Sequence, residues 1–210
     1  MKIRKFRKIF IAGQNGMVGS ALYRFAIKNR LSNEIIKLNR KDIDFLDKKK
    51  TFNFLKKQKP DIVFICAAKV GGILANNNYP VDFLLNNLEI QNNLISGCFE
   101  ANIDRVIFFG SSCIYPKHYY KKNKSFKEEH MLSGNLELTN EPYAIAKIAG
   151  IKLCESYNRQ YNRDYRSIIP CNLYGPNDNF HPDNSHVLAA LIKKFNYAKK
   201  NNHKLVKIWG

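Results

Sequence analysis

The residues best suited to acid–base chemistry are Tyr143 and Lys147, at the two ends of the stretch Tyr-Ala-Ile-Ala-Lys. They are four residues apart, so a helix would place both side chains on one face. A phenol titrates at about pH 10, but a nearby ammonium favours the phenolate and lowers that pKa. The pair could therefore give or take a proton at the oxygen of an alcohol or a ketone. An ordinary surface pair has the same spacing, so the pattern needs support from the elements around it.

Two other stretches would supply that support. Upstream lies an apolar run, Arg105 to Phe109, which reads as a buried strand and leads into Gly110, Ser111, Ser112 and Cys113. Near the N-terminus a short apolar strand, residues 8–12, is followed by Gly-x-x-Gly-x-x-Gly at 13–19 and a helix over 17–28. Glycines in such a turn let the backbone approach a pyrophosphate, which then lies on the helix N-terminus. The strand–turn–helix setting favours dinucleotide binding over a chance glycine turn.

In this order, the three features resemble the extended short-chain dehydrogenase/reductase family. Within it, residues 111–117, 140–147 and 172–182 are similar to the GDP-L-fucose synthases, and the resemblance runs from about Lys8 to Gly210. It implies NADPH as cofactor and GDP-4-dehydro-6-deoxy-D-mannose as substrate, epimerised at C3 and C5 and then reduced at C4. Two alternatives stay open: another nucleotide-sugar epimerase or dehydratase of this fold, or an inactive cofactor-binding fragment.

The resemblance also implies the roles of individual residues. Ser111, which we prefer to its neighbour Ser112, would bind the substrate oxygen beside Tyr143 and Lys147. Cys113 and His186 would be base and acid in the epimerisation, in an order that the sequence leaves open. Lys194 would meet a phosphate and Trp209 would stack on a ring of the nucleotide-sugar. The residues expected to line the cofactor are Gly13, Gln14, Asn15, Gly16, Met17, Val18, Gly19, Arg40, Phe109, Gly110, Ser111, Ser112, Lys147, Pro170, Cys171, Asn172, Leu173 and His186.

The form of the cofactor depends on the end of the second predicted strand, residues 34–38. An acidic residue there would bind the ribose 2′-hydroxyl of NAD, whereas this chain has Asn39 and Arg40. Arg40 suits a 2′-phosphate, which favours NADPH, although it could also be a solvated arginine in a lysine-rich loop. The family often has arginine in the glycine turn, where this chain has Asn15.

The rest of the chain alternates strands with helices. We expect helices over 48–58 after an N-cap at Asp47, over 82–102, over 142–161 and over 186–200, and strands over 62–68 and 164–169 and from 203 to 209. Residues 117–139 read as a charged loop that could cover the site. This alternation predicts an α/β fold with a doubly wound parallel sheet. We expect an NADP-binding Rossmann domain over 1–170 and a partial substrate lobe over 171–210, so the chain looks truncated at its C-terminus.

Composition excludes some classes of function. The net charge is +18, but the lysines are spread along the chain with no aromatic-interleaved stripe, which argues against a nucleic-acid binder. No stretch is long enough to span a membrane, and the apolar run at 9–12 is too short for a signal peptide. Five scattered cysteines predict reduced thiols in the cytoplasm, and we expect no metal. By analogy with the family, the helices over 82–102 and 142–161 would form a homodimer interface.

Overall fold

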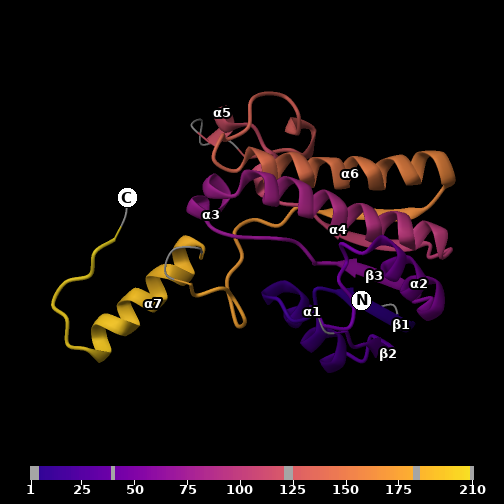
Figure 1. Cartoon of the computed structure of the whole chain (residues 1–210), viewed down its shortest axis with the longest axis horizontal. Helices are drawn as coiled ribbons and strands as arrows, with labels where there is room; N and C mark the ends of the chain where they lie inside the picture. The colour runs from indigo at the N-terminus through magenta and orange to yellow at the C-terminus, as the bar shows by residue number, and fades with distance from the viewer. Residues whose placement is uncertain (1–4, 39–40, 121–124, 182–184, 209–210) are drawn as a thin grey trace.

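A five-stranded parallel sheet forms the centre of the molecule, in a computed structural model that describes residues 5–38, 41–120, 125–181 and 185–208 (Figure 1). The strands are β1 (Phe6–Ala12), β2 (Ser32–Ile36), β3 (Ile62–Ile65), β4 (Arg105–Phe109) and β5 (Asp164–Ile168). Their order across the sheet is β2-β1-β3-β4-β5, and all four neighbouring pairs are parallel. The predicted α/β fold with a parallel sheet is confirmed.

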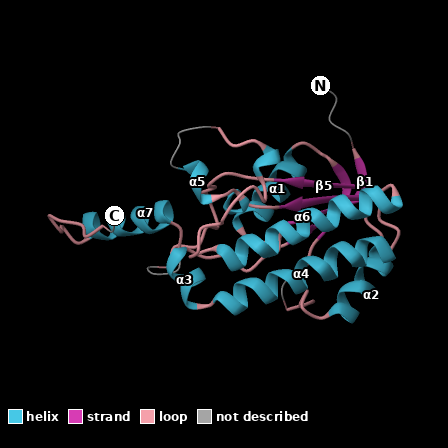
Figure 2. Ribbon diagram, turned by 90° about the horizontal axis from the view of Figure 1, so that it is seen from above, coloured by secondary structure: helices cyan, strands magenta, loops and turns pink. Residues whose placement is uncertain are grey.

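Helices cover the two faces of this sheet unequally. On one face α2 (Lys48–Gln58), α4 (Pro80–Glu100) and α6 (Glu141–Tyr161) lie side by side (Figures 1 and 2). On the other face α1 (Met17–Lys28) packs against β1, β2 and β3. The alternation of side chains along β1 explains the two layers, because Phe10 and Ala12 join the core under α2, α4 and α6 while Ile9 and Ile11 face α1.

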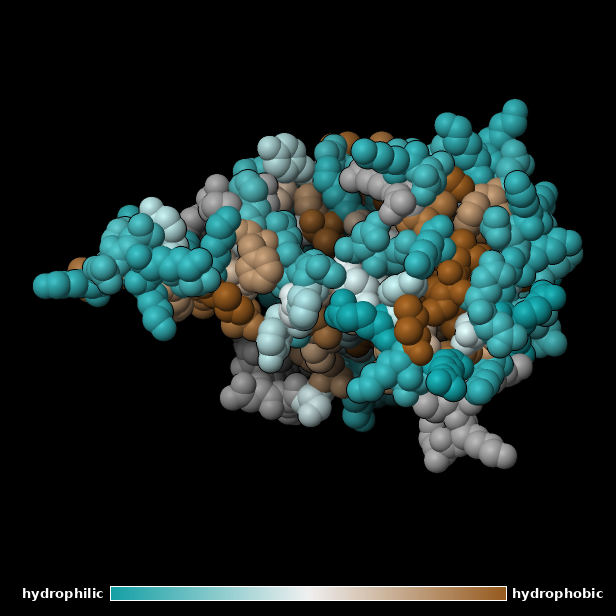
Figure 3. Space-filling model, turned by 90° about the horizontal axis from the view of Figure 1, so that it is seen from below, coloured by the Kyte–Doolittle hydropathy of each residue, from teal (hydrophilic) through white to brown (hydrophobic). Residues whose placement is uncertain are grey.

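The strands farther from α1 are less covered on that face. In β4, Val106 and Phe108 are fully buried under α4 and α6, whereas Ile107 and Phe109 are only half-buried on the opposite side. In β5, Ile168 on that side is 45% exposed. Figure 3, which views the molecule from below, shows several patches of apolar atoms among the hydrophilic ones. Strands with apolar side chains on both faces, such as β4, are typical of sheets that are covered by helices on both faces.

The strand order reverses next to β1. From β1 the chain passes through α1 to the edge strand β2, then returns through α2 to β3 on the other side of β1. In open parallel sheets ligands bind outside the carboxyl ends of the strands at such a reversal. The residues that follow β1, β3 and β4, namely 13–19, 66–69 and 110–113, all leave the sheet at this edge.

Most predicted elements are confirmed with shifted ends. The second strand covers 32–36 instead of 34–38, the third ends at Ile65 instead of Ala68, and the long helix covers 80–100 instead of 82–102. Two α-helices among the described residues were not predicted: α3 (Ile73–Asn78) after the third strand and α5 (Lys117–Tyr120) in the presumed loop. That loop also holds a 3₁₀ turn, Glu128–His130, and its Phe126 ring stacks on Tyr115 at 4.8 Å between centroids. Tertiary contacts of this kind are not visible in local sequence patterns.

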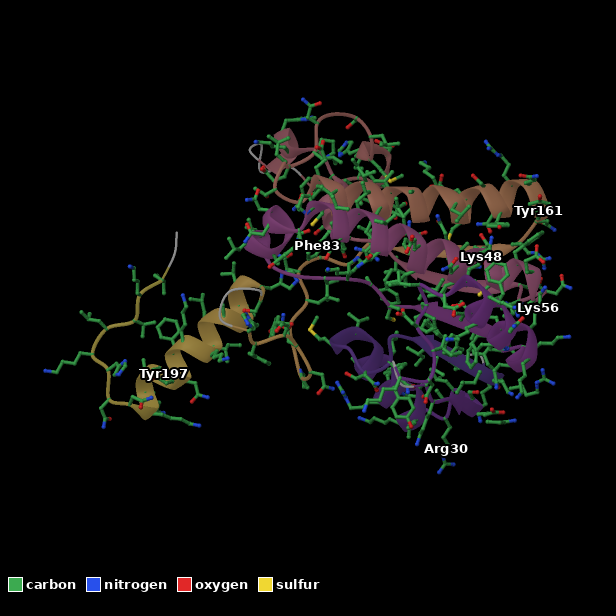
Figure 4. All side chains as sticks on the ribbon, in the orientation of Figure 1. Arg30, Lys48, Lys56, Phe83, Tyr161 and Tyr197 are labelled. Carbon is green, nitrogen blue, oxygen red and sulfur yellow. The ribbon has the colours of Figure 1, made fainter. Side chains whose placement is uncertain are left out.

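The C-terminal part contains α7 (Val187–Lys200), which projects from the body of the molecule (Figures 1 and 4, with Tyr197 labelled). The strand predicted from His203 is wrong over the described residues 203–208, which form no regular structure. Leu205 is 88% exposed, and no described strand lies beside it to complete the backbone hydrogen bonds that a strand needs. Within the described part of the chain, no helix combines the length and apolarity needed to cross a membrane.

Candidate active site at the carboxyl ends of the strands

The glycine turn after β1 is shaped by two close backbone approaches. Gly13 has φ +86°, and a Cβ on it would lie 2.7 Å from the backbone nitrogen of Ala67 at the end of β3. A Cβ on Gly19, in the first turns of α1, would lie 2.1 Å from the carbonyl oxygen of Gly13. Both contacts are to backbone, which cannot move aside. Glycine is therefore required at these two positions to bring the turn, β3 and α1 together.

The space above this turn is suited to a phosphate group. Gly16 precedes the first residue of α1 and is exposed, and no acidic side chain lies in the first turn of the helix. The free N–H groups at a helix N-terminus carry partial positive charge and bind anions. Gln14 ties the turn to the end of β2, because its Nε2 donates to the carbonyl oxygen of Leu38 at 3.0 Å. The residues present therefore fit the pyrophosphate of a dinucleotide.

Ser111 and Cys113 follow β4 directly. The side chain of Ser111 accepts a hydrogen bond from the Cys113 backbone N–H at 3.3 Å and so starts the short 3₁₀ turn Ser112–Ile114. Ile114 and Tyr115 are buried, which anchors this turn in the core. Ser111 also lies close enough to Tyr143 for its hydroxyl to lower the pKa of that phenol. The structure thus brings together the serine and tyrosine that the sequence analysis paired.

Lys147 lies one helical turn below Tyr143 on α6 and is only 3% exposed. Its Nζ donates to the carbonyl oxygen of Phe109 at 2.9 Å and lies 5.7 Å from the centroid of the Tyr143 ring. Burial lowers the pKa of Lys147 to about 8, because a buried ammonium loses its hydration. The thiol of Cys66 at the end of β3 opposes this shift. This lysine therefore changes its protonation state near pH 8, well below the usual value of 10.5, and is still mostly charged at neutral pH.

The pKa of Tyr143 is raised, which differs from the lowering expected from the lysine alone. Burial is the largest cause, the Cys113 sulfur adds to it, and only the Ser111 side chain opposes it. A phenolate in this place would lose its hydration. The ammonium of Lys147 does not compensate for that loss, because its Nζ donates to the carbonyl oxygen of Phe109. Tyr143 is therefore protonated at neutral pH, as a group must be before it can donate a proton.

Cys113 lies within the same group. Nδ2 of Asn140, the residue before α6, lies 3.4 Å from its Sγ atom. The ring of Phe83 packs edge-on against Tyr143 with centroids 6.4 Å apart, and Figure 4 shows it near the same end of α4 and α6. Ser111, Cys113, Asn140, Tyr143 and Lys147 thus form one contiguous cluster, which we call the Ser111–Lys147 cluster.

Other predicted site residues lie outside this cluster. His186 is exposed at the start of α7, and no hydrogen bond or ion pair among the described residues joins it to Cys113. Lys194 is on α7, where its Nζ donates to the carbonyl oxygen of Lys207 at 3.4 Å. Residues 170–173 leave β5 as a largely exposed segment, and Asn177 beyond it bonds Ser20 of α1 at 3.0 Å. Arg40 and Trp209 fall outside the described residues.

The sequence analysis missed two side chains at this edge. Asn140 belongs to the stretch 140–147 that carries the family resemblance, but it was given no role, because nothing in the local sequence indicates a contact with sulfur. Asn87, only 2% exposed in α4, accepts from the Lys69 N–H at 2.8 Å and donates to the Lys69 carbonyl at 3.0 Å. It fixes the segment after β3, and Lys69 itself pairs with Asp82. A polar side chain inside the apolar stripe of a predicted helix was the available signal.

Comparison with known proteins shows which proteins share this architecture. The profile of the NAD dependent epimerase/dehydratase family matches residues 9–210. The chain is 50% identical over 204 residues to the GDP-L-fucose synthase of Escherichia coli K12, covering 97% of this chain and 62% of that protein. It is 47% identical to GDP-L-fucose synthase 1 of Arabidopsis thaliana, covering 98% of this chain and again 62% of the relative.

A solved structure agrees with these relatives. The GDP-L-fucose synthetase of Naegleria fowleri bound to NADP has a TM-score of 0.87 and 29% identity, with 100% of this chain and 67% of that chain covered. The chain spans about 62% of the length of the curated relatives that it matches first. The match extends over more than nine-tenths of the 210 residues, from the glycine turn through α7. The chain therefore belongs to the NAD dependent epimerase/dehydratase family.

Proposed function

We propose that this chain carries the cofactor-binding and catalytic part of a GDP-L-fucose synthase that uses NADPH. The observation that supports it most is the Ser111–Lys147 cluster, which lies with the glycine turn at one edge of the sheet. The 50% identity to the Escherichia coli enzyme supports the choice of GDP-4-dehydro-6-deoxy-D-mannose as substrate.

The reduction step needs a proton donor at the ketone oxygen. When bound, the reduced nicotinamide supplies a hydride to C4 of the sugar. Ser111 would hydrogen-bond the C4 oxygen, and Tyr143, whose pKa is raised, would give that oxygen its proton. Lys147, held by the Phe109 carbonyl, would steady the cofactor ribose beside the cluster. These roles require a buried, dry environment, which the 3% exposure of Lys147 supports.

The epimerisation needs a second pair of groups. The C4 ketone acidifies the protons at C3 and C5, so a base can remove one and leave its electrons in an enolate. An acid on the opposite face then returns a proton to the same carbon. Cys113 lies beside Tyr143 and is suited to one of these roles. His186 is our proposal for the other, which requires α7 to bring it to the sugar.

Mutation can test whether the epimerisation and the reduction depend on different residues. Tyr143→Phe removes the proton donor of the reduction, so it should abolish NADPH oxidation and keep deuterium exchange at C3 and C5 in deuterated water. Cys113→Ser should reduce that exchange by a factor of roughly 10² or more, as is usual for loss of an acid–base group. Exchange would be followed by mass spectrometry of the GDP-sugar. Wild-type exchange in Cys113→Ser would refute the role of this thiol.

Cofactor preference can be tested without substrate. We propose tighter binding of NADPH than of NADH, because Arg40 follows β2 where an acidic residue would favour NAD. Arg40→Ala should weaken NADPH binding by about tenfold, the worth of a charge-assisted contact, and leave NADH binding nearly unchanged. Fluorescence titration measures both, with Lys41→Ala as the neighbouring control. Equal affinities in the parent chain would contradict the proposal.

Assembly and location complete the proposal. We propose a homodimer formed through α4 and α6, supported by exposed apolar side chains on both helices, among them Val81, Leu85 and Ile145. We further propose a cytoplasmic location, supported by five cysteines that are all free thiols. Cell fractionation with an antibody to the chain tests the location.

A further inference from the structure

Asn140 directs its side chain to sulfur and away from the helix that it precedes. Asparagine at this position usually caps a helix by accepting a backbone N–H. Here the α6 N-terminus receives no hydrogen bond from the Asn140 side chain. Instead Nδ2 of Asn140 lies 3.4 Å from Sγ of Cys113, which is within the range of a hydrogen bond to sulfur. The amide is thus used for a contact 27 residues away along the chain.

The backbone holds this amide firmly in place. The Asn140 N–H donates to the carbonyl oxygen of Glu137 at 3.1 Å, and its carbonyl accepts from the Ala144 N–H at 2.9 Å. The partner is also fixed, because the Cys113 N–H donates to Ser111 at 3.3 Å. The backbone at both residues is therefore held by hydrogen bonds, which limits the conformational entropy lost when their side chains make contact.

Within the described part of the chain, the Asn140 side chain makes no other hydrogen bond that would explain its orientation. Its Oδ1 atom is buried, and among the described residues no donor reaches it. Leaving a buried acceptor unpaired costs free energy. The amide therefore keeps its contact with sulfur even though its oxygen atom has no hydrogen bond among the described residues. Unsatisfied buried groups are uncommon in folded proteins, and a catalytic role is one of their explanations.

We propose that Asn140 is a positioning residue for acid–base chemistry at Cys113: its N–H donor orients the sulfur and stabilises the thiolate. A donor hydrogen-bonded to the charged form of a group favours that form. Of the two roles left open for Cys113, this favours the base: the thiolate would take a proton from carbon and become a thiol, and the amide would remain neutral throughout. The inference rests on the acid–base role proposed above for Cys113, but the hydrogen bond itself can be tested apart from that role.

The test measures the reactivity of the Cys113 thiol against pH. Only the thiolate reacts with iodoacetamide, and peptide mass spectrometry separates Cys113 from the exposed Cys171. In Asn140→Ala the pH of half-maximal alkylation at Cys113 should rise by about one unit, the worth of one hydrogen bond to a charged group. In Asn140→Asp it should rise further, because a carboxylate repels the thiolate.

Two controls separate this effect from a loss of structure. Asn140→Asp keeps the shape of the side chain and can cap α6, so it carries the test if Asn140→Ala unfolds. Asn135→Ala makes the same change at an exposed site in the same segment and should leave the alkylation profile unchanged. Thermal unfolding of all three variants checks that each is folded at the temperature of the assay.

The outcomes are distinct for this inference and for the proposed function. Unshifted profiles in both Asn140 variants would overturn the inference, whatever the chain does to GDP-sugars. Shifted profiles support it, even if the parent chain exchanges no sugar protons, a result that would count against the proposed function instead. Where the parent does exchange them, Asn140→Ala should slow exchange at C3 or C5 by about tenfold, matching the shift of one unit.

Discussion

Burial dominates the electrostatics of individual residues in the Ser111–Lys147 cluster. It lowers the pKa of Lys147 and raises that of Tyr143, and each shift disfavours the charged form. At neutral pH the cluster therefore holds a proton on the phenol and only a weakly held proton on the amine. Such perturbed groups at the ligand edge of a sheet are typical of active sites.

The lowered pKa of Lys147 predicts how the stability of the folded protein changes with pH. Below about pH 8 the native lysine is charged and buried, so its desolvation cost is fully present. Between about pH 8 and its normal pKa of 10.5, the native state loses this proton while the unfolded chain keeps it. The unfolded state then binds more protons, and stability attributable to this residue rises with pH. In Lys147→Met this rise of stability with pH is absent, because methionine does not titrate.

The melting temperature of Lys147→Met minus that of the parent should therefore fall as pH rises from 7 to 10. Differential scanning calorimetry in steps of pH measures it. Lys57→Met, at an exposed lysine of α2, provides the matched control and should show a constant difference. A constant difference for Lys147→Met as well would mean that this amine titrates normally in the folded protein.

At the scale of elements, the glycine turn decides how β1, β3 and α1 meet. Two of its glycines face backbone atoms at distances that no side chain can occupy, whereas Gly16 has room. A Cβ on Gly16 would lie 3.5 Å from the Gly13 carbonyl oxygen, which is ordinary van der Waals contact. Within this one motif, Gly13 and Gly19 must therefore be glycine, whereas Gly16 has room for a side chain.

We expect Gly19→Ala to destabilise the fold by about 1–3 kcal/mol, the usual cost of overpacking, or by more because the obstacle is backbone. Gly16→Ala should cost at most about 1 kcal/mol, since no described atom lies too close. Urea unfolding followed by circular dichroism gives both values. Similar stability of the two variants would show that the turn relaxes around Gly19.

For the whole molecule, the exposed faces of α4 and α6 predict how copies associate. Leu85 is 48% exposed and Ile145 is 44% exposed, and the two helices lie next to each other on the same layer (Figure 2). Exposed apolar side chains on adjacent helices are typical of an interface. A twofold arrangement would pair each helix with its counterpart and bury both faces.

The double substitution Leu85→Asp with Ile145→Asp should therefore lower the mass from that of a dimer to that of a monomer. Multi-angle light scattering at micromolar concentration measures the change. Ile27→Asp, at a 53% exposed site of α1 on the opposite face of the sheet, should leave the mass unchanged. A parent chain of monomeric mass would contradict the interface.

Local patterns in the sequence determined much of this protein. The glycine turn, the four-residue spacing of Tyr143 and Lys147, and the alternation of strands and helices depend on neighbouring residues, and the structure places them as expected. The family could be identified from the same motifs. These features were predictable because backbone turns and helix faces follow from residues a few positions apart.

Only the tertiary structure decided how these pieces act on one another. The rise in the pKa of Tyr143 comes from burial by distant segments, and the contact of Asn140 with Cys113 joins two elements far apart in the chain. Residues 203–208 have the apolar character of a strand, yet no neighbouring strand is present among the described residues to pair with them. Desolvation and backbone pairing depend on what lies across space, and the order of residues along the chain does not specify this directly.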